Sequence, residues 1–212
     1  MHIWTTAAPP FHKNGYIVAC EDTREAIVID PGDDVREQLA VVKREGVKVK
    51  MILLTHAHLD HVTGVGPAKA ALGVDVWLHA DDLFLYERTA EQAQMFGMQA
   101  EQPPPPDHFY APGQTFTFGN LAVEIGHTPG HCPGGVVLAI GRQGQSEREL
   151  FVGDTLFAGS IGRTDLPGGD LDTLIASIRN VLFAYPDSTI VHSGHGPDTT
   201  IGEERRTNPF LN

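Results

Sequence analysis

A predicted buried strand that ends in four metal-ligand-type side chains constrains this chain more than any other feature. The stretch ILLTHAHLDHVTG, residues 52–64, begins as an apolar run and then places three histidines and one aspartate within six residues. Burying four polar side chains without hydrogen-bond or metal partners would cost free energy, so the fold must supply such partners. The stretch therefore predicts a metal site at the end of a strand.

The four side chains of this stretch divide into two pairs. Side chains alternate along an extended backbone, so His56 and His58 are expected to project to the same side and to hold one ion together. Asp60 and His61 stand where the strand gives way to a helix, and the change of backbone direction points them toward a second ion. The helix N-terminus also favours the charged form of Asp60.

Polar side chains of the same kind follow three later apolar runs. IGHTPGHCPGG carries His127 and His131, ELFVGDTLF carries Asp154, and IVHSGHGP carries His195. A catalytic zinc ion takes about three protein ligands and keeps one position for water, so one segment alone does not complete two sites. Each of these residues taken singly is explained as well by a turn or a structural hydrogen bond. Their recurrence after strands, in loops that glycine and proline stiffen, favours ligands on a rigid scaffold.

The remaining pattern predicts two β-rich halves that each carry helices. Helices are expected over residues 35–45, 81–98 and 171–185, with a further one ending at Gly73. Strands are expected near residues 14–20, 25–30, 49–55, 74–79, 114–119, 121–127, 134–140, 149–155 and 188–196. We therefore expect an α/β (α+β) fold, a four-layer αββα sandwich of two mixed β-sheets with helices on the outer faces. No convincing boundary divides residues 1–212, which are expected to form a single domain.

The composition excludes several classes of partner. The chain has 15 Lys and Arg against 27 Asp and Glu, a formal charge of −12, which argues against nucleic acid and anionic membranes as partners. No apolar run reaches the length of a membrane span, and the N-terminus lacks the pattern of a signal peptide. Two cysteines do not make a disulfide framework, so a reduced, cytoplasmic setting is expected.

The motifs together resemble the metallo-β-lactamase-fold superfamily. The HxHxDH signature is present as HAHLDH, and HTPGH, GDTLF and GHGP follow it in the family's order. Within the superfamily the chain is similar to glyoxalase II (hydroxyacylglutathione hydrolase), in its short bacterial form, through VIDPG, GSIGRTDLPGG and the closing ERRTNPFL. The longer enzymes carry a C-terminal helical extension with further glutathione contacts, and a protein of the short type is expected to lack it.

The resemblance implies a role for each candidate residue. It assigns one metal ion to His56, His58 and His131, the other to Asp60, His61 and His195, and both to Asp154 as a bridge. Asp60 is also the expected catalytic residue, which orients the nucleophile. His127 is expected to orient the His131 loop rather than to bind metal. Arg163 is expected to bind a glutathione carboxylate, with the alternative that it braces its own loop through Asp165.

The implied function is the hydrolysis of small-molecule thioesters. The resemblance favours S-(2-hydroxyacyl)glutathione, such as S-lactoylglutathione, as substrate and a metal-bound hydroxide as nucleophile. Two divalent ions are expected, with zinc preferred and iron or manganese compatible. One alternative is a persulfide dioxygenase with a single iron on His56, His131 and Asp154. Others are another hydrolase of this fold, such as a lactonase, and a non-catalytic binding protein; the oligomeric state stays open.

Overall fold

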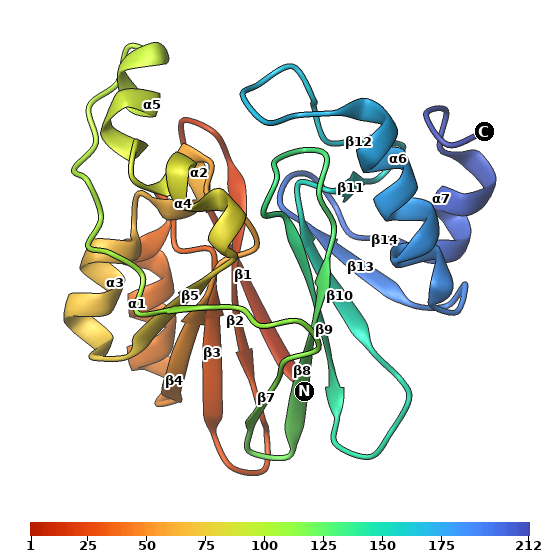
Figure 1. The fold of residues 1–212 in the computed structure, drawn as a ribbon. Coiled ribbons are helices and arrows are strands. Elements are labelled where there is room, and N and C mark those ends of the chain that lie inside the picture. Colours follow the sequence, from red (N-terminus) through yellow and green to blue (C-terminus); the bar gives the residue numbers. More distant parts are fainter. The chain divides into compact units, whose positions relative to one another are not determined.

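The computed structural model describes residues 1–212, which divide into two compact units. The first unit comprises Met1–Tyr110 with Thr117–Leu121, and the second comprises Ala111–Phe116 with Ala122–Asn212. Each of the two large sheets has six strands, and Figure 1 shows both with their helices.

The sheet of the first unit has its strands in chain order and mixes both pairing directions. β1, β2 and β3 are antiparallel neighbours, whereas β3, β4, β5 and β6 are parallel. The strands span β1 His2–Ala8, β2 Lys13–Ala19, β3 Glu25–Ile29, β4 Lys48–Leu53, β5 Asp75–Leu78 and β6 His108–Phe109. The sequence did not predict β1, because HIWTTAA lacks a clear apolar alternation.

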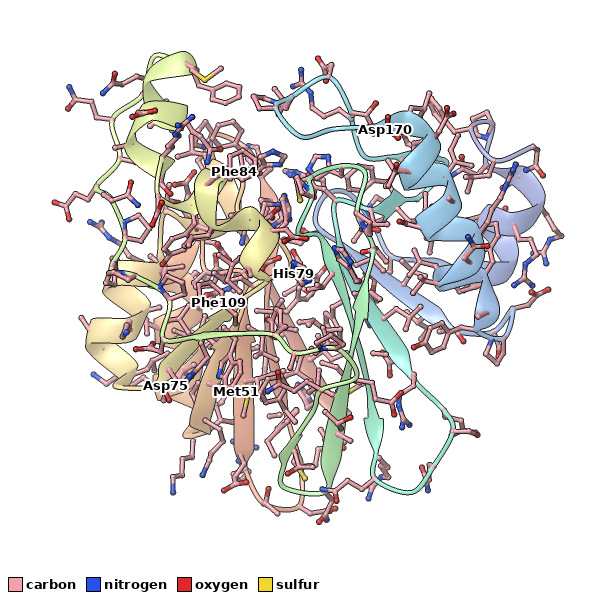
Figure 2. The ribbon with its side chains drawn as sticks, viewed as in Figure 1. Met51, Asp75, His79, Phe84, Phe109 and Asp170 are labelled. Atoms are coloured by element: carbon pink, nitrogen blue, oxygen red, sulfur yellow. The ribbon has the colours of Figure 1, made fainter.

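The parallel strands explain where this unit gathers its polar side chains. β3 contains the buried apolar run Ala26–Ile29, and β4 ends with the buried residues Ile52 and Leu53. Their carboxyl ends meet at one edge of the sheet, where Asp30 follows β3, Thr55 follows β4 and His79 follows β5. Figure 2 shows the direction of β5, because Asp75 at its start and His79 beyond its end lie at opposite ends of the strand.

Six helical segments belong to the first unit. They are α1 Val35–Glu45, α2 Leu59–Val62, α3 Val65–Leu72, the 3₁₀ segment η1 Ala80–Asp82, α4 Leu83–Tyr86 and α5 Thr89–Met95. α1 and α3 lie together on one face of the first sheet (Figure 1). The helix predicted over 35–45 is confirmed by α1, which ends at Gly46 with a φ of 63°.

The helical stretch predicted over 81–98 is confirmed up to Met95, but it is divided into η1, α4 and α5. Arg88 leaves the helical conformation, with φ −114° and ψ 23°. The hydroxyl of Thr89 donates to the carbonyl of Tyr86 at 2.7 Å, a local bond that competes with a continuous helical ladder.

The second sheet is also mixed, in the order β14-β13-β10-β9-β8-β7. β10 and β13 are parallel, and β9–β10 and β13–β14 are antiparallel. The strands span β7 Thr115–Phe118, β8 Leu121–His127, β9 Val136–Arg142, β10 Glu149–Gly153, β13 Ile190–Ser193 and β14 Thr199–Thr200, with a separate hairpin of β11 Leu156–Phe157 and β12 Ser160–Ile161. Two mixed sheets with accompanying helices confirm the predicted mixed α/β fold class.

The helices of the second unit are α6 Leu171–Asn180, the 3₁₀ segment η2 Leu182–Ala184 and α7 Ile201–Thr207. Asp170 (Figure 2) is the N-cap of α6, and its carboxylate accepts from the Thr173 backbone N–H at 2.8 Å. Leu174 and Ile178 of this helix are buried against the apolar side chains of β10 and α7. The helix predicted over 171–185 is therefore shorter than expected, and α7 was not predicted. No helix of the chain has both the length and the apolar character that crossing a membrane requires.

Candidate metal centre

The ligand-type side chains of the first unit follow β4 directly. β4 ends at Leu53, an irregular segment with a bend at Thr55 follows, His58 is extended, and α2 begins at Leu59. His56, His58 and His61 are buried, and Asp60 is partly exposed. The rings of His56 and His61 are 4.0 Å apart between centroids, and His61 Nε2 lies 3.7 Å from Asp60 Oδ2. Three imidazoles and a carboxylate thus share one buried turn.

Asp30 contacts His61 directly and His56 through the hydroxyl of Thr55. Its Oδ1 accepts from the Thr55 N–H at 2.7 Å, and its Oδ2 accepts from the Thr55 hydroxyl at 2.6 Å and lies 2.9 Å from His61 Nδ1. The same hydroxyl lies 3.1 Å from His56 Nδ1. The backbone of Asp30 has a φ of 49°, a conformation that few residues other than glycine adopt, so the turn after β3 is shaped around these bonds.

The Asp30 contact determines which nitrogen of His61 is available to bind metal. An ionised carboxylate only accepts hydrogen bonds, so the proton of the neutral ring sits on Nδ1. Nε2 then keeps its lone pair, the form in which an imidazole binds a metal ion. Asp30 is not among the residues that the sequence predicts for the site. The signal for it was its position after an apolar strand, which matches that of the predicted ligands.

Two further side chains form hydrogen bonds with the backbone of Ala57 and Leu59, the residues between the ligand-type side chains. The carboxylate of Asp82, which is fully buried, accepts from the Ala57 N–H at 3.0 Å. The amide of Gln92 accepts from the Leu59 N–H and donates to the Ala57 carbonyl, both at 3.1 Å. The broken helical segment after β5 therefore fixes the strand-to-helix turn that carries the histidines.

The second unit brings His131, Asp154 and His195 together. Asp154 Oδ2 lies 3.8 Å from His131 Nε2 and 3.6 Å from His195 Nε2. His131 Nδ1 lies 2.7 Å from the Arg163 carbonyl, an acceptor, so that nitrogen carries the ring proton and Nε2 faces the carboxylate with its lone pair. A lone pair and a carboxylate facing each other in a partly buried place are stabilised when a cation lies with them. This donor set therefore suits a divalent ion.

The loop that carries His131 is tightly braced. Gly130 has a φ of 127°, and a Cβ there would lie 2.2 Å from the backbone nitrogen of Leu174, so only glycine fits. The Asp170 N–H donates to the Gly130 carbonyl at 2.8 Å. His127 Nε2 donates to the Pro133 carbonyl at 2.8 Å, a bond across the loop, and its role in orienting His131 stays a prediction.

Arg163 makes its side-chain contacts within its own loop. Its guanidinium binds the Asp165 carboxylate with two bonds of 2.7 Å, and both side chains are exposed. The hydrogen bond from Arg163 lowers the pKa of Asp165 to about 2. This geometry matches the alternative that Arg163 braces its loop, and its substrate contact stays a prediction.

The whole chain is similar to known proteins of one family. The model of the metallo-β-lactamase superfamily matches residues 8–195. The hydroxyacylglutathione hydrolase GloC of Haemophilus influenzae is 39% identical over 214 residues, which cover 100% of this chain and 99% of that protein.

Two solved structures resemble this fold over nearly its full length. The BLEG-1 B3 metallo-β-lactamase is 38% identical, covers 100% of both chains and gives a TM-score of 0.90. The protein TTHA1623, solved in a di-iron-bound form, is 41% identical, covers 98% of this chain and 100% of its own, and gives a TM-score of 0.87. The superfamily implies divalent metal binding, which the two His/Asp clusters suit. The chain belongs to the metallo-β-lactamase superfamily and is a metallo-hydrolase of that fold.

Proposed function

We propose that this protein hydrolyses thioesters, in particular S-(2-hydroxyacyl)glutathione such as S-lactoylglutathione. The observation that carries the proposal is the pair of His/Asp clusters whose imidazole Nδ1 atoms are held by acceptors, which leaves Nε2 atoms for metal. The thioester substrate is supported by the full-length similarity to a protein named for that activity. We propose that the two units form one domain, since one family model spans both.

The proposed ligands are those that the sequence motifs assign. One ion would take His56, His58 and His131, the other Asp60, His61 and His195, and Asp154 would bind both. Zinc is the proposed metal, because neutral imidazoles and carboxylates suit it. Iron is the main competitor, since a similar protein holds two iron ions.

The chain's own residues would prepare water for attack on the thioester. Two bound divalent ions would lower the pKa of a coordinated water toward about 7 and polarise the carbonyl oxygen. Asp60 is partly exposed beside His61, so its carboxylate can accept a hydrogen bond from the attacking water and orient it. The water oxygen bonds to the carbonyl carbon and the C–S bond breaks. The thiolate then takes up a proton, which yields a hydroxy acid and a thiol.

A covalent mechanism fits the structure less well. Cys20 and Cys132 are both buried, with 3% and 0% of their surface exposed, and are therefore poorly placed as nucleophiles. The GxSxG motif of serine hydrolases is absent from the sequence. Neither Cys20 nor Cys132 forms a disulfide, which is compatible with the proposed cytoplasmic location.

A substrate panel tests the proposal. The purified protein loaded with zinc, iron or manganese would be assayed with S-lactoylglutathione, a simple acyl thioester, a lactone and glutathione persulfide. The proposal predicts the highest kcat/KM for S-lactoylglutathione. Equal turnover of the simple thioester would refute glutathione recognition. Oxygen consumption on the persulfide with one iron per chain would instead establish a dioxygenase.

A further inference from the structure

The closing segment ERRTNPFL contains a buried carboxylate that the proposed chemistry does not use. Glu204 lies in the middle of α7 and exposes 1% of its surface, and Asn208 just after the helix exposes none. A buried carboxylate is costly unless several donors satisfy it, so its donors show what the residue holds in place.

Three hydrogen bonds reach the Glu204 carboxylate. Oε2 accepts from the Gly159 N–H at 2.9 Å and from the Asn208 side-chain amide at 2.7 Å. Oε1 accepts from the Thr199 hydroxyl at 2.6 Å. The Asn208 amide also donates to the Ser160 carbonyl at 3.0 Å, so Glu204 and Asn208 together hold two consecutive residues, Gly159 and Ser160.

Gly159 lies in the turn of the β11–β12 hairpin and Ser160 begins β12; the hairpin itself begins two residues after Asp154. The hairpin packs directly on that ligand, since a Cβ at Gly162 would lie 1.9 Å from the Asp154 carbonyl. The chain then reaches Arg163, whose carbonyl holds His131 Nδ1 at 2.7 Å. Glu204 therefore supports the segment that carries Asp154 and orients His131.

The third bond reaches a different ligand segment. Thr199 begins β14, directly after the loop of residues 194–198 that carries His195. His195 Nε2 lies 3.6 Å from Asp154 Oδ2, so one carboxylate anchors the segments on both sides of this contact. A shift of either segment would change the spacing of the ligand atoms, and metal sites tolerate little change in spacing.

We infer that Glu204 is a positioning residue that sets the mutual geometry of Asp154, His195 and His131. The inference rests on the proposed assignment of these three residues as metal ligands. Residues that orient ligands typically change metal affinity or activity by about 10- to 100-fold when they are removed.

Replacing Glu204 tests this inference against a purely structural role. Glu204→Ala removes all three bonds. Glu204→Gln keeps an acceptor for Gly159 and Asn208 and turns its NH₂ toward the Thr199 hydroxyl, which can accept. The matched control is Arg205→Met in the same helix, because Arg205 binds Asp187 and the carbonyls of Phe183 and Tyr185, away from the ligand segments.

The readouts are the melting temperature, the affinity for Zn²⁺ by titration, the visible spectrum of the Co²⁺-loaded protein and kcat at saturating metal. We expect Glu204→Ala to lose about 10- to 100-fold in the affinity of at least one ion and to change the Co²⁺ spectrum. Glu204→Gln should restore both, and Arg205→Met should lower only the melting temperature. Glu204→Ala and Arg205→Met with equal losses of stability and wild-type metal affinities would overturn the inference.

A milder variant keeps the test valid if Glu204→Ala does not fold. Thr199→Val removes only the hydroxyl that joins Glu204 to the His195 segment, and it should weaken one ion more than the other. Wild-type affinities for both ions in Thr199→Val would then overturn the inference. Metal affinity that depends on Glu204 in a protein without thioesterase activity would refute the proposed function and leave the inference standing.

Discussion

Replacing Asp30 by asparagine should disable His61 as a metal ligand while leaving the shape of the turn intact. The carboxylate receives two bonds from Thr55 and one from His61 Nδ1. In Asp30→Asn the amide oxygen can still accept from the Thr55 N–H. The NH₂ group, which only donates, then faces the Thr55 hydroxyl and His61 Nδ1, where the wild-type carboxylate accepts. His61 keeps this contact only by moving its proton to Nε2, which removes the lone pair that binds metal.

The expected loss follows from these contacts. If the ring keeps its proton on Nδ1, two donors face each other in a buried place, at a cost of about 1–3 kcal/mol. If the proton moves, the ligand nitrogen is blocked. Either outcome agrees with the loss of about 10- to 100-fold in metal affinity, or about 1.4–2.7 kcal/mol, that removing a ligand's hydrogen-bond partner typically causes.

Calorimetric titration with zinc and the ¹⁵N NMR shifts of the His61 ring would measure the two effects separately. Asp33→Asn is the matched control, because Asp33 stands in the same turn and accepts from the Thr63 hydroxyl at 2.9 Å. That variant should bind zinc within about twofold of wild type. Wild-type zinc affinity in Asp30→Asn, with Nε2 still unprotonated, would refute the reasoning.

Three further predictions concern other parts of the second unit and the loaded protein. Burial alone would lower the pKa of His192, but the carboxylates of Glu149 at 2.8 Å and Asp198 at 3.1 Å raise this pKa above the usual value of 6.5. The contacts of the charged His192 ring therefore stabilise the fold fully below pH 6.5, and this stabilisation is lost as the pH rises through the folded pKa. Urea unfolding should therefore show a larger stability loss in His192→Gln at about pH 5.5 than at about pH 9, and a loss independent of pH would contradict this. Gly162→Ala should lower the free energy of unfolding by about 1–3 kcal/mol and weaken zinc binding, since the new Cβ would push Asp154; unchanged denaturant and zinc titrations would count against it. Removing the metal with a chelator should lower the melting temperature, and adding zinc again should restore it. At a free zinc concentration 100 times the Kd, binding should raise the free energy of unfolding by about 2.7 kcal/mol. An unchanged melting curve would argue against a metal bound to the native state.

The ligand turn was largely predictable because its signals are local. An apolar strand, a change of period and a run of histidines stand within 13 residues, so both the end of β4 and the start of α2 near Leu59 could be expected. The bounds of α1 were equally clear, but its buried face was not: Leu39 and Val42, the apolar pair expected on one face, are only partly buried. Val35, Gln38 and Val41 are buried instead.

The supporting residues were hidden because their partners lie far away in the sequence. Asp30 binds residues 25 and 31 positions later, and Glu204 binds Gly159, 45 positions earlier. No periodicity reports such pairs. The start of α7 does have a local sequence signal, because Thr200 and Glu203 have the spacing of a capping box. In the structure the Thr200 hydroxyl accepts from the Glu203 N–H at 3.2 Å.

Diffraction data collected at the absorption edge of the bound metal would test the central claim most directly. The account predicts two anomalous peaks per chain. The first should contact His56, His58 and His131, the second should contact Asp60, His61 and His195, and both should contact Asp154. A single peak, or two peaks with other ligands, would contradict it.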